Sequence, residues 1–130
     1  QQAIQDASCE VDISILTGDF YHEGGSRVFA EHIRNKNSIP SAIFAFNDAM
    51  ALGVLDVLHD IPEKVPEVVQ VVGFDNNEIA QYIGLSTVGF PMQQIGEEAT
   101  RLAAKRIKKR NGEPVTVTMG TSLIARKTTL

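Results

Sequence analysis

Residues 42–46 (AIFAF) and 48–59 (DAMALGVLDVLH) pass from a short apolar run to a helical pattern, with Asn47 between them. Residues 68–74 (VVQVVGF) form a second, almost continuous apolar run that ends at Asp75. Runs of this kind are typical of parallel strands, because such strands are covered on both faces of their sheet. The two segments together predict an α/β fold in which strands and helices alternate.

The same alternation extends along the chain in both directions. Short apolar runs predict strands, and apolar residues at helical spacing predict helices. The predicted strands are residues 11–16, 42–46, 68–74, 85–90, 115–118 and 122–125. The predicted helices are residues 26–35, 48–59, 78–83 and 92–110, the last ending before Asn111-Gly112 and Pro114. The expected architecture is therefore a doubly wound, mostly parallel sheet.

Composition and charge narrow the classes of protein that fit. The single cysteine, Cys9, excludes an internal disulfide and a multi-cysteine zinc site, and it favours a reducing, cytoplasmic compartment. No apolar run approaches the roughly 18 residues that span a bilayer, so no membrane partner is expected. Residues 1–100 carry 15 acidic and 4 basic side chains, which disfavours general nucleic-acid binding. The basic residues within 101–110 are expected on the solvent face of a helix, near its C-terminal end.

Polar and aromatic residues stand where three predicted strands end. Asp19 and Phe20 follow the first strand, Asn47 and Asp48 follow the second, and Asp75 follows the third. In a doubly wound sheet, ligands bind beside the carboxyl ends of the strands. Each residue alone is better explained as a helix cap, a turn residue or a core aromatic. Their convergence on one edge predicts a ligand-binding site.

A second interpretation takes the three aspartates at these strand ends as ligands of Mg²⁺ in a phosphoryl-transfer site. Hard cations prefer oxygen ligands, and Asp19, Asp48 and Asp75 would supply them. The sequence offers no glycine-rich phosphate loop, no Gly-x-Ser-x-Gly elbow and no Cys-His pair to go with such a site. We therefore expect a binding domain rather than an enzyme, with neither a cofactor nor a metal.

The helix predicted over residues 48–59 is apolar on nearly every face, and such a helix must be buried all round. One face can pack on the sheet. We expect the other face to pack on a partner subunit, with Gly53 allowing close approach, which predicts a homodimer. The alternative is that a second layer of the same chain covers that face.

The order of motifs resembles the lactose-repressor family of bacterial transcriptional regulators. The motifs are residues 41–53 (SAIFAFNDAMALG), 71–76 (VVGFDN), 85–88 (LSTV) and 123–128 (LIARKT). Members of this family have a two-lobed fold like that of type I periplasmic binding proteins, preceded by a helix-turn-helix headpiece. Their effectors, usually sugars or nucleobases, bind in the cleft between the lobes. The resemblance implies an effector-sensing and dimerisation module of a DNA-binding regulator.

The resemblance also assigns roles to individual residues. It implies that Phe20 stacks on the effector ring, while Asn47 and Asp75 hydrogen-bond to effector hydroxyls or ring nitrogens. It places a dimer interface along residues 51–56 and 79–84. The interface residues it indicates are Ala51, Leu52, Leu55, Ile79, Tyr82 and Ile83.

The family's architecture implies a division of the chain. Residues 1–90 would form the C-terminal lobe, 91–114 a crossover helix that belongs with the N-terminal lobe, and 115–130 terminal strands that close the lobes. The headpiece and first lobe are expected outside this chain, so operator DNA would be bound only through the absent headpiece. Without that lobe, we expect the helix over residues 92–110 to pack on its own lobe or a neighbouring chain. Such packing would hide Ile95, Leu102 and Ile107.

A periplasmic sugar-binding protein for transport shares the fold and stays an alternative.

Overall fold

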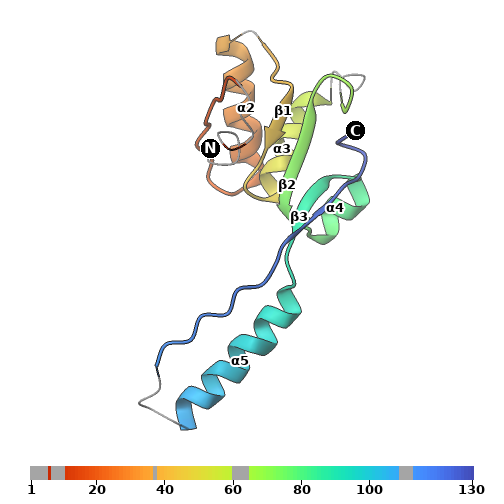
Figure 1. Ribbon diagram of the computed structural model, residues 1–130. Coiled ribbons are helices and arrows are strands. Elements are labelled where there is room, and N and C mark those ends of the chain that lie inside the picture. The colour runs from red at the N-terminus through yellow and green to blue at the C-terminus, as the bar shows by residue number, and fades with distance from the viewer. Residues whose placement is uncertain (1–5, 7–10, 37, 60–64, 109–112) are drawn as a thin grey trace.

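The computed structural model describes residues 6, 11–36, 38–59, 65–108 and 113–130 (Figure 1). Its strands form a four-stranded sheet in the order β1-β2-β3-β4. They are β1 (Ala42–Phe44), β2 (Gln70–Asp75), β3 (Ser86–Gly89) and β4 (Ser122–Ile124). The first three are parallel neighbours, and β4 runs antiparallel to β3. The predicted α/β class with a mostly parallel sheet is confirmed.

The helices follow the strands in the predicted order. They are α2 (His22–Lys36), α3 (Asp48–Leu58), α4 (Glu78–Ile83) and α5 (Met92–Lys108). The helix α2 begins four residues before its predicted start. The sequence does not reveal this first turn, because Gly24 and Gly25 have low helix propensity. The last helix is predicted to end at residue 110, and residues 109–110 lie outside the described residues. Cys9 lies outside them as well.

The core lies around α3, which packs against β2 on one side and against α2 on the other. Its buried side chains come from these three elements, from α4 and from the neighbouring loops: Phe29, Ala45, Ala51, Val54, Leu58, Val69, Val71, Ala80 and Leu85. Each fully buried leucine, valine or phenylalanine stabilises the fold by about 1.5–3 kcal/mol relative to exposure. The apolar sequence of α3 is therefore explained by two layers of the same chain.

This arrangement corrects the expectation that a partner subunit covers the second face of α3. A Cβ atom on Gly53 would lie 2.1 Å from the carbonyl oxygen of His22 and 2.7 Å from the backbone nitrogen of Ser26. Gly53 thus allows the close approach of α2, an element of its own chain. The less favoured alternative, a second layer from the same fold, is the one observed.

The helix α5 and residues 113–121 extend away from the sheet as an arm (Figure 1). No residue of α5 is buried, and Ile107 is 79% exposed. Ile95 and Leu102 line a shallow groove together with Val117 and Met119 of the same arm. The expectation that this helix packs on its own lobe is wrong, and packing on a neighbouring chain stays a prediction.

Two predicted strands, at residues 11–16 and 115–118, are not formed. Both segments lack an assigned strand, and the side chains of Val11, Ile15 and Val115 are exposed. A strand must pair its backbone N–H and C=O groups with a neighbouring strand, and neither segment pairs with β1 or β4, the edge strands of the described sheet. Their apolar alternation shows which face they could bury, whereas a strand also needs a partner.

Candidate ligand-binding site

The three predicted ligand residues all stand at the carboxyl edge of the parallel strands. Phe20 precedes α2, Asn47 lies between β1 and α3, and Asp75 ends β2. The backbone is left-handed at Phe20 (φ 69°), Asp75 (φ 115°) and Asn76 (φ 55°), and the described chain has no other non-glycine residue with positive φ. Such conformations cost about 1–3 kcal/mol each and cluster at functional sites. The backbone therefore marks the same edge that the strand ends indicate.

Asn47 joins two of the elements that meet at this edge. Its Oδ1 accepts a hydrogen bond from the backbone N–H of Met50 at 2.8 Å, which caps the N-terminus of α3. Its Nδ2 donates to the carbonyl oxygen of Phe20 at 2.8 Å. A side-chain amide carries two N–H donors, so one stays available after the bond to Phe20. The residue is both a helix cap and a half-buried donor at the site.

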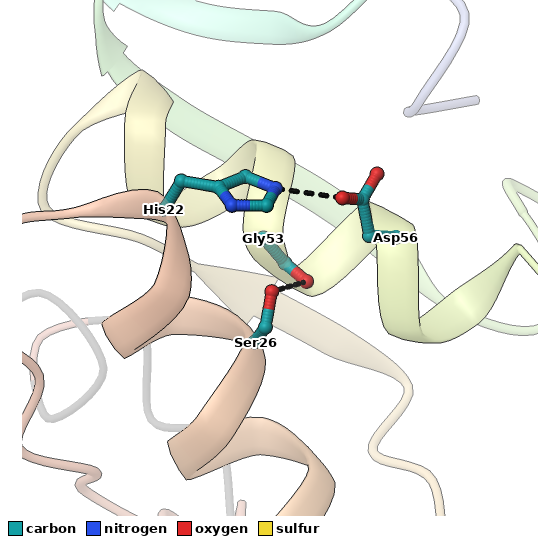
Figure 2. A network of polar contacts seen from close by, with 4 residues as sticks. All are labelled: His22, Ser26, Gly53 and Asp56. Atoms are coloured by element: carbon teal, nitrogen blue, oxygen red, sulfur yellow. Dashed lines mark hydrogen bonds and ion pairs between the residues drawn. The ribbon is translucent and has the colours of Figure 1, made fainter.

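Phe20 presents its ring to solvent, with 65% of the residue exposed. Its position is fixed through α2, which begins two residues later and is tied to α3 by two polar contacts. Figure 2 shows the His22 ring facing the Asp56 carboxylate, with Nε2 and Oδ2 separated by 2.6 Å. In the next turn, Ser26 Oγ donates to the carbonyl oxygen of Gly53 at 3.0 Å. The ring is therefore exposed on a backbone that is held in place.

Asp48 occupies the centre of the site's supporting structure and is 1% exposed. Its Oδ1 accepts from the Thr87 hydroxyl at 2.6 Å, and its Oδ2 accepts from the backbone N–H of Asn77 at 2.8 Å. A Cβ atom on Gly73 in β2 would lie 2.3 Å from Oδ1, so a glycine at this position leaves room for the Asp48 carboxylate. Asp48 is thus a bridge between α3, β3 and the start of α4. The sequence predicts Asp48 as a helix cap or a metal ligand and gives no sign of this bridge.

Asp75 lies beside Asp48 and is partly shielded from water. Burial raises the pKa of Asp75, the negative charge of Asp48 raises it further, and a hydrogen bond from the Asp48 backbone lowers it part of the way. Asp75 is thus close to Asp48, the first residue of α3, and Asn47 caps the same helix. The three predicted residues are therefore gathered around the start of one helix.

The carboxylates do not form the metal site of the alternative interpretation. Asp19 Oδ1 accepts from the backbone N–H of Tyr21 at 3.0 Å, and its Oδ2 lies 3.8 Å from Arg27 Nη2. Both oxygens of Asp48 are already bonded within the protein. Across the described ranges, no three His, Cys, Asp or Glu side chains are placed to hold a metal ion. The predicted Mg²⁺ ligand set of Asp19, Asp48 and Asp75 is therefore not assembled.

The residues assigned to a dimer interface fall into two groups. Ala51 is fully buried in the core, so the prediction for this residue is wrong: α2 and the sheet already surround α3. Leu52 and Leu55 are half-buried on α3. On α4 the side chains are exposed, and Tyr82 reaches 80%. Of the six predicted interface residues, the exposed ones are Ile79, Tyr82 and Ile83 on α4.

No helix in the described part of the chain is long and apolar enough to cross a membrane.

Residues 1–129 match the family described as periplasmic binding protein-like domain. The chain is 29% identical over 130 residues to the HTH-type transcriptional repressor PurR of Vibrio atlanticus, which covers 98% of this chain and 39% of that protein. It is 35% identical over 116 residues to PurR of Vibrio parahaemolyticus, covering 88% of this chain and 34% of that protein. The chain thus spans between a third and two-fifths of these relatives.

Solved structures of similar proteins have the same fold. A complex of the transcriptional regulator CelR with cellobiose superposes with a TM-score of 0.86 at 32% identity, covering 98% of this chain and 39% of that one. A LacI family transcriptional regulator from Enterococcus faecium with bound ribose gives a TM-score of 0.84 at 25% identity. That match covers 98% of this chain and 48% of the other.

Proposed function

Because the chain belongs to the periplasmic binding protein-like domain family, in its lactose-repressor (LacI/GalR) branch, we propose that it senses a small-molecule effector for a transcriptional regulator. The observation that carries this proposal is the gathering of Phe20, Asn47 and Asp75 at one sheet edge, where the backbone is left-handed at Phe20 and Asp75. The similar proteins are named as transcriptional repressors and regulators, which favours sensing over transport.

The proposed roles follow from the chemistry of each side chain. The exposed ring of Phe20 offers an apolar face on which a sugar ring or a planar base can stack. The free N–H of Asn47 donates to an effector oxygen or ring nitrogen, and the Asp75 carboxylate accepts from effector hydroxyl or N–H groups. A sugar fits this set because it has an apolar face of C–H groups and an edge of hydroxyls. A nucleobase fits through its flat face and polar rim.

The regulator is proposed to respond by a shift between two arrangements of its lobes. In this proposal residues 1–90 form one lobe, residues 91–114 belong with a second lobe supplied by the rest of the protein, and residues 115–130 return to the first. An effector that binds one arrangement more tightly shifts the population toward it. Operator DNA is bound through a helix-turn-helix headpiece elsewhere in the protein, in the cytoplasm, without enzymatic activity or cofactor.

Ligand binding is tested by nuclear magnetic resonance on the ¹⁵N-labelled chain, titrated separately with ribose, cellobiose and adenine. We expect weak binding that shifts the amide signals around Phe20, Asn47 and Asp75. The variants Phe20→Ala and Asp75→Asn should abolish the shifts. The control Val68→Ala trims an exposed apolar side chain before β2, at the opposite end of the strands, and should leave them unchanged. If the probes shift only residues elsewhere, or bind the Phe20→Ala variant equally well, the proposal is wrong.

We also propose that two copies of the chain associate through α4 and the adjoining part of α3. The surface consists of the exposed Ile79, Tyr82 and Ile83 together with the half-buried Leu52 and Leu55. A cluster of exposed apolar side chains of this kind is typical of a protein–protein interface.

Sedimentation equilibrium tests this interface. The variant Ile79→Asp should weaken self-association at least about tenfold, because a carboxylate would be buried without a partner. The control Val68→Asp places the same charge on an exposed apolar residue outside α3 and α4, and it should have no effect. A parent chain that stays monomeric at tens of micromolar would refute the interface.

A further inference from the structure

The guanidinium of Arg126 connects the start of β3 to the turn that carries Asp75. Arg126 follows β4 in the chain and is half-buried. Its Nη1 donates to the carbonyl oxygen of Leu85 at 2.7 Å, and its Nη2 donates to Oδ1 of Asn76 at 2.7 Å. Two bonds from one planar group fix its orientation as well as its position. Asn76 is the residue immediately after Asp75, so this contact reaches the candidate site.

The backbone that carries Arg126 is itself held on the sheet. The N–H of Arg126 donates to Ser86 Oγ at 2.7 Å, and the N–H of Lys127 donates to the carbonyl oxygen of Gly84 at 2.9 Å. The next residue, Thr128, is buried, and its hydroxyl donates to the carbonyl oxygen of Val71 at 2.7 Å. Arg126 therefore reaches the turn from a fixed point.

The turn at residues 75–76 needs such support because both residues have left-handed backbone. On one side it is held by Asp48, through the N–H of Asn77, and by the Thr87 hydroxyl, which accepts from the N–H of Asn76 at 3.3 Å. The bond from Arg126 holds the Asn76 side chain. Strained conformations of this kind persist only where the surroundings fix them.

We propose that Arg126 is a positioning residue that fixes the turn at residues 75–76, and with it the place of the Asp75 carboxyl group. Its consequence for ligand binding rests on the proposed function. The sequence gives Arg126 no obvious link to Asp75, which lies about fifty residues earlier. The two meet because β4 runs antiparallel to β3, which lies between β4 and β2, and the Arg126 side chain after β4 reaches Asn76 after β2.

The same contact lies at the base of the arm. Gly89 at the end of β3 is paired with Ser122 at the start of β4, and the arm leaves and re-enters the sheet between them. A Cβ atom on Gly89 would lie 3.0 Å from Ile124 Cδ1 and 3.2 Å from Asn76 Cβ. Asn76 is thus packed against the two strands that carry the arm. The bond from Arg126 ties the Asp75 turn to the strand through which the arm returns.

The proposal is tested with Arg126→Lys, which keeps the positive charge and cannot bond Leu85 and Asn76 together. Measured on the full chain without ligand, the backbone coupling constant of Asp75 should change. Amide exchange at Asn77, whose N–H is bonded to Asp48, should speed up about tenfold, the scale of one lost charge-assisted hydrogen bond. The N–H of Ala45, which follows β1, donates to the carbonyl oxygen of Val72 in β2, and its exchange rate should not change.

Two further variants separate positioning from general disturbance. Asn76→Asp keeps an oxygen acceptor for Arg126 and should retain the parent's exchange rate at Asn77. Lys127→Ala alters the neighbouring side chain and should leave the Asp75 coupling constant unchanged. Parent-like values for Asp75 and Asn77 in Arg126→Lys would overturn the proposal, as would equal acceleration at Ala45.

Ligand binding gives a separate readout. For any of ribose, cellobiose or adenine that binds the parent, Arg126→Lys should weaken binding about tenfold. Unchanged affinity alongside an altered Asp75 turn would overturn the positioning role in binding. If none of these probes binds the parent, the proposed function fails, and the coupling and exchange measurements still decide whether Arg126 fixes the turn.

Discussion

Replacing Gly73 by alanine perturbs the candidate site from inside the sheet. A Cβ atom at this position would lie 2.3 Å from Asp48 Oδ1 and 3.0 Å from Leu85 Cδ2. The Asp48 carboxylate cannot turn aside freely, because its oxygens are bonded to the Thr87 hydroxyl and the Asn77 N–H. The added methyl group must therefore displace the carboxylate and strain both bonds.

The size of the effect follows from three contributions. Overpacking a filled site costs about 1–3 kcal/mol. Loss of one hydrogen bond to a charged group adds about 1.5–3 kcal/mol. Replacing glycine within a strand returns about 0.5–1 kcal/mol, because the unfolded chain loses freedom. We expect Gly73→Ala to lower the free energy of unfolding by about 3 kcal/mol.

The assay is urea unfolding followed by far-ultraviolet circular dichroism, with the slope of the free energy against urea required to stay constant. The matched control is Gly96→Ala in α5, where an added Cβ would have no heavy atom within 4 Å. That change should be neutral or stabilise by up to about 1 kcal/mol, the helix-propensity difference between the two residues.

A double-mutant cycle identifies the obstacle. In an Asp48→Ala background the carboxylate is gone, so Gly73→Ala should cost less than about 1 kcal/mol, giving a coupling energy of about 2 kcal/mol. Trimethylamine N-oxide in every sample keeps the less stable variants folded at the start of the titration. An equal cost of Gly73→Ala in both backgrounds would refute the role given to Asp48.

Three further predictions follow from the same contacts. Gly53→Ala should destabilise by about 1–3 kcal/mol in urea unfolding, because the new Cβ meets the α2 backbone; a neutral result would contradict the α2–α3 packing. The pKa of Asp75 is raised by burial and by Asp48, so its ionisation weakens the fold as pH rises through that pKa. Asp75→Asn should therefore stabilise the chain at neutral pH, with the gain disappearing below the ordinary carboxyl pKa; urea unfolding across pH checks the sign. Millimolar Mg²⁺ should leave the thermal midpoint unchanged, and a concentration-dependent rise would restore the metal alternative.

The position of the site could be predicted from the sequence because it depends on local signals. Each parallel strand is recognisable from its own apolar run, and the rule that ligands bind at the carboxyl edge needs only the residues that follow each run. Asn47 and Asp75 satisfy that rule. The prediction for Phe20 rests on a strand that is not formed, and the residue lies at this edge because its carbonyl oxygen accepts from Asn47. Whether they bind an effector is the subject of the titrations proposed above.

The features that could not be predicted depend on which segments, distant in the sequence, pack against each other in the fold. The apolar pattern of α3 requires cover on all faces, and it does not distinguish α2 from a second subunit. Residues 11–16 and 115–118 have the alternation of strands, and neither segment pairs with β1 or β4, the edge strands of the described sheet. In each case the sequence states a requirement, and the tertiary structure decides how it is met.

Asp48 shows the same limit within the site. An aspartate after a strand is a plausible helix cap, turn residue or metal ligand. It bridges three elements because the fold brings Thr87 and Asn77, which lie 39 and 29 residues later in the chain, next to its carboxylate. Gly73 leaves space for that carboxylate. In the sequence, Gly73 and Asp48 belong to two separate motifs, and nothing there indicates that the two residues are in contact.

The strained backbone and its tethers determine how this lobe would take part in binding under the proposed function. Asn47 holds Phe20, Asp48 holds the N–H after the 75–76 turn, and Arg126 holds the side chain of Asn76. Holding these groups before a ligand arrives reduces the ordering cost of binding. The arm, in contrast, has no buried residue in α5 and joins the sheet only where β3 and β4 pair. Under the proposed function this lobe therefore presents a preformed half-site, and Arg126 connects it to the base of the arm.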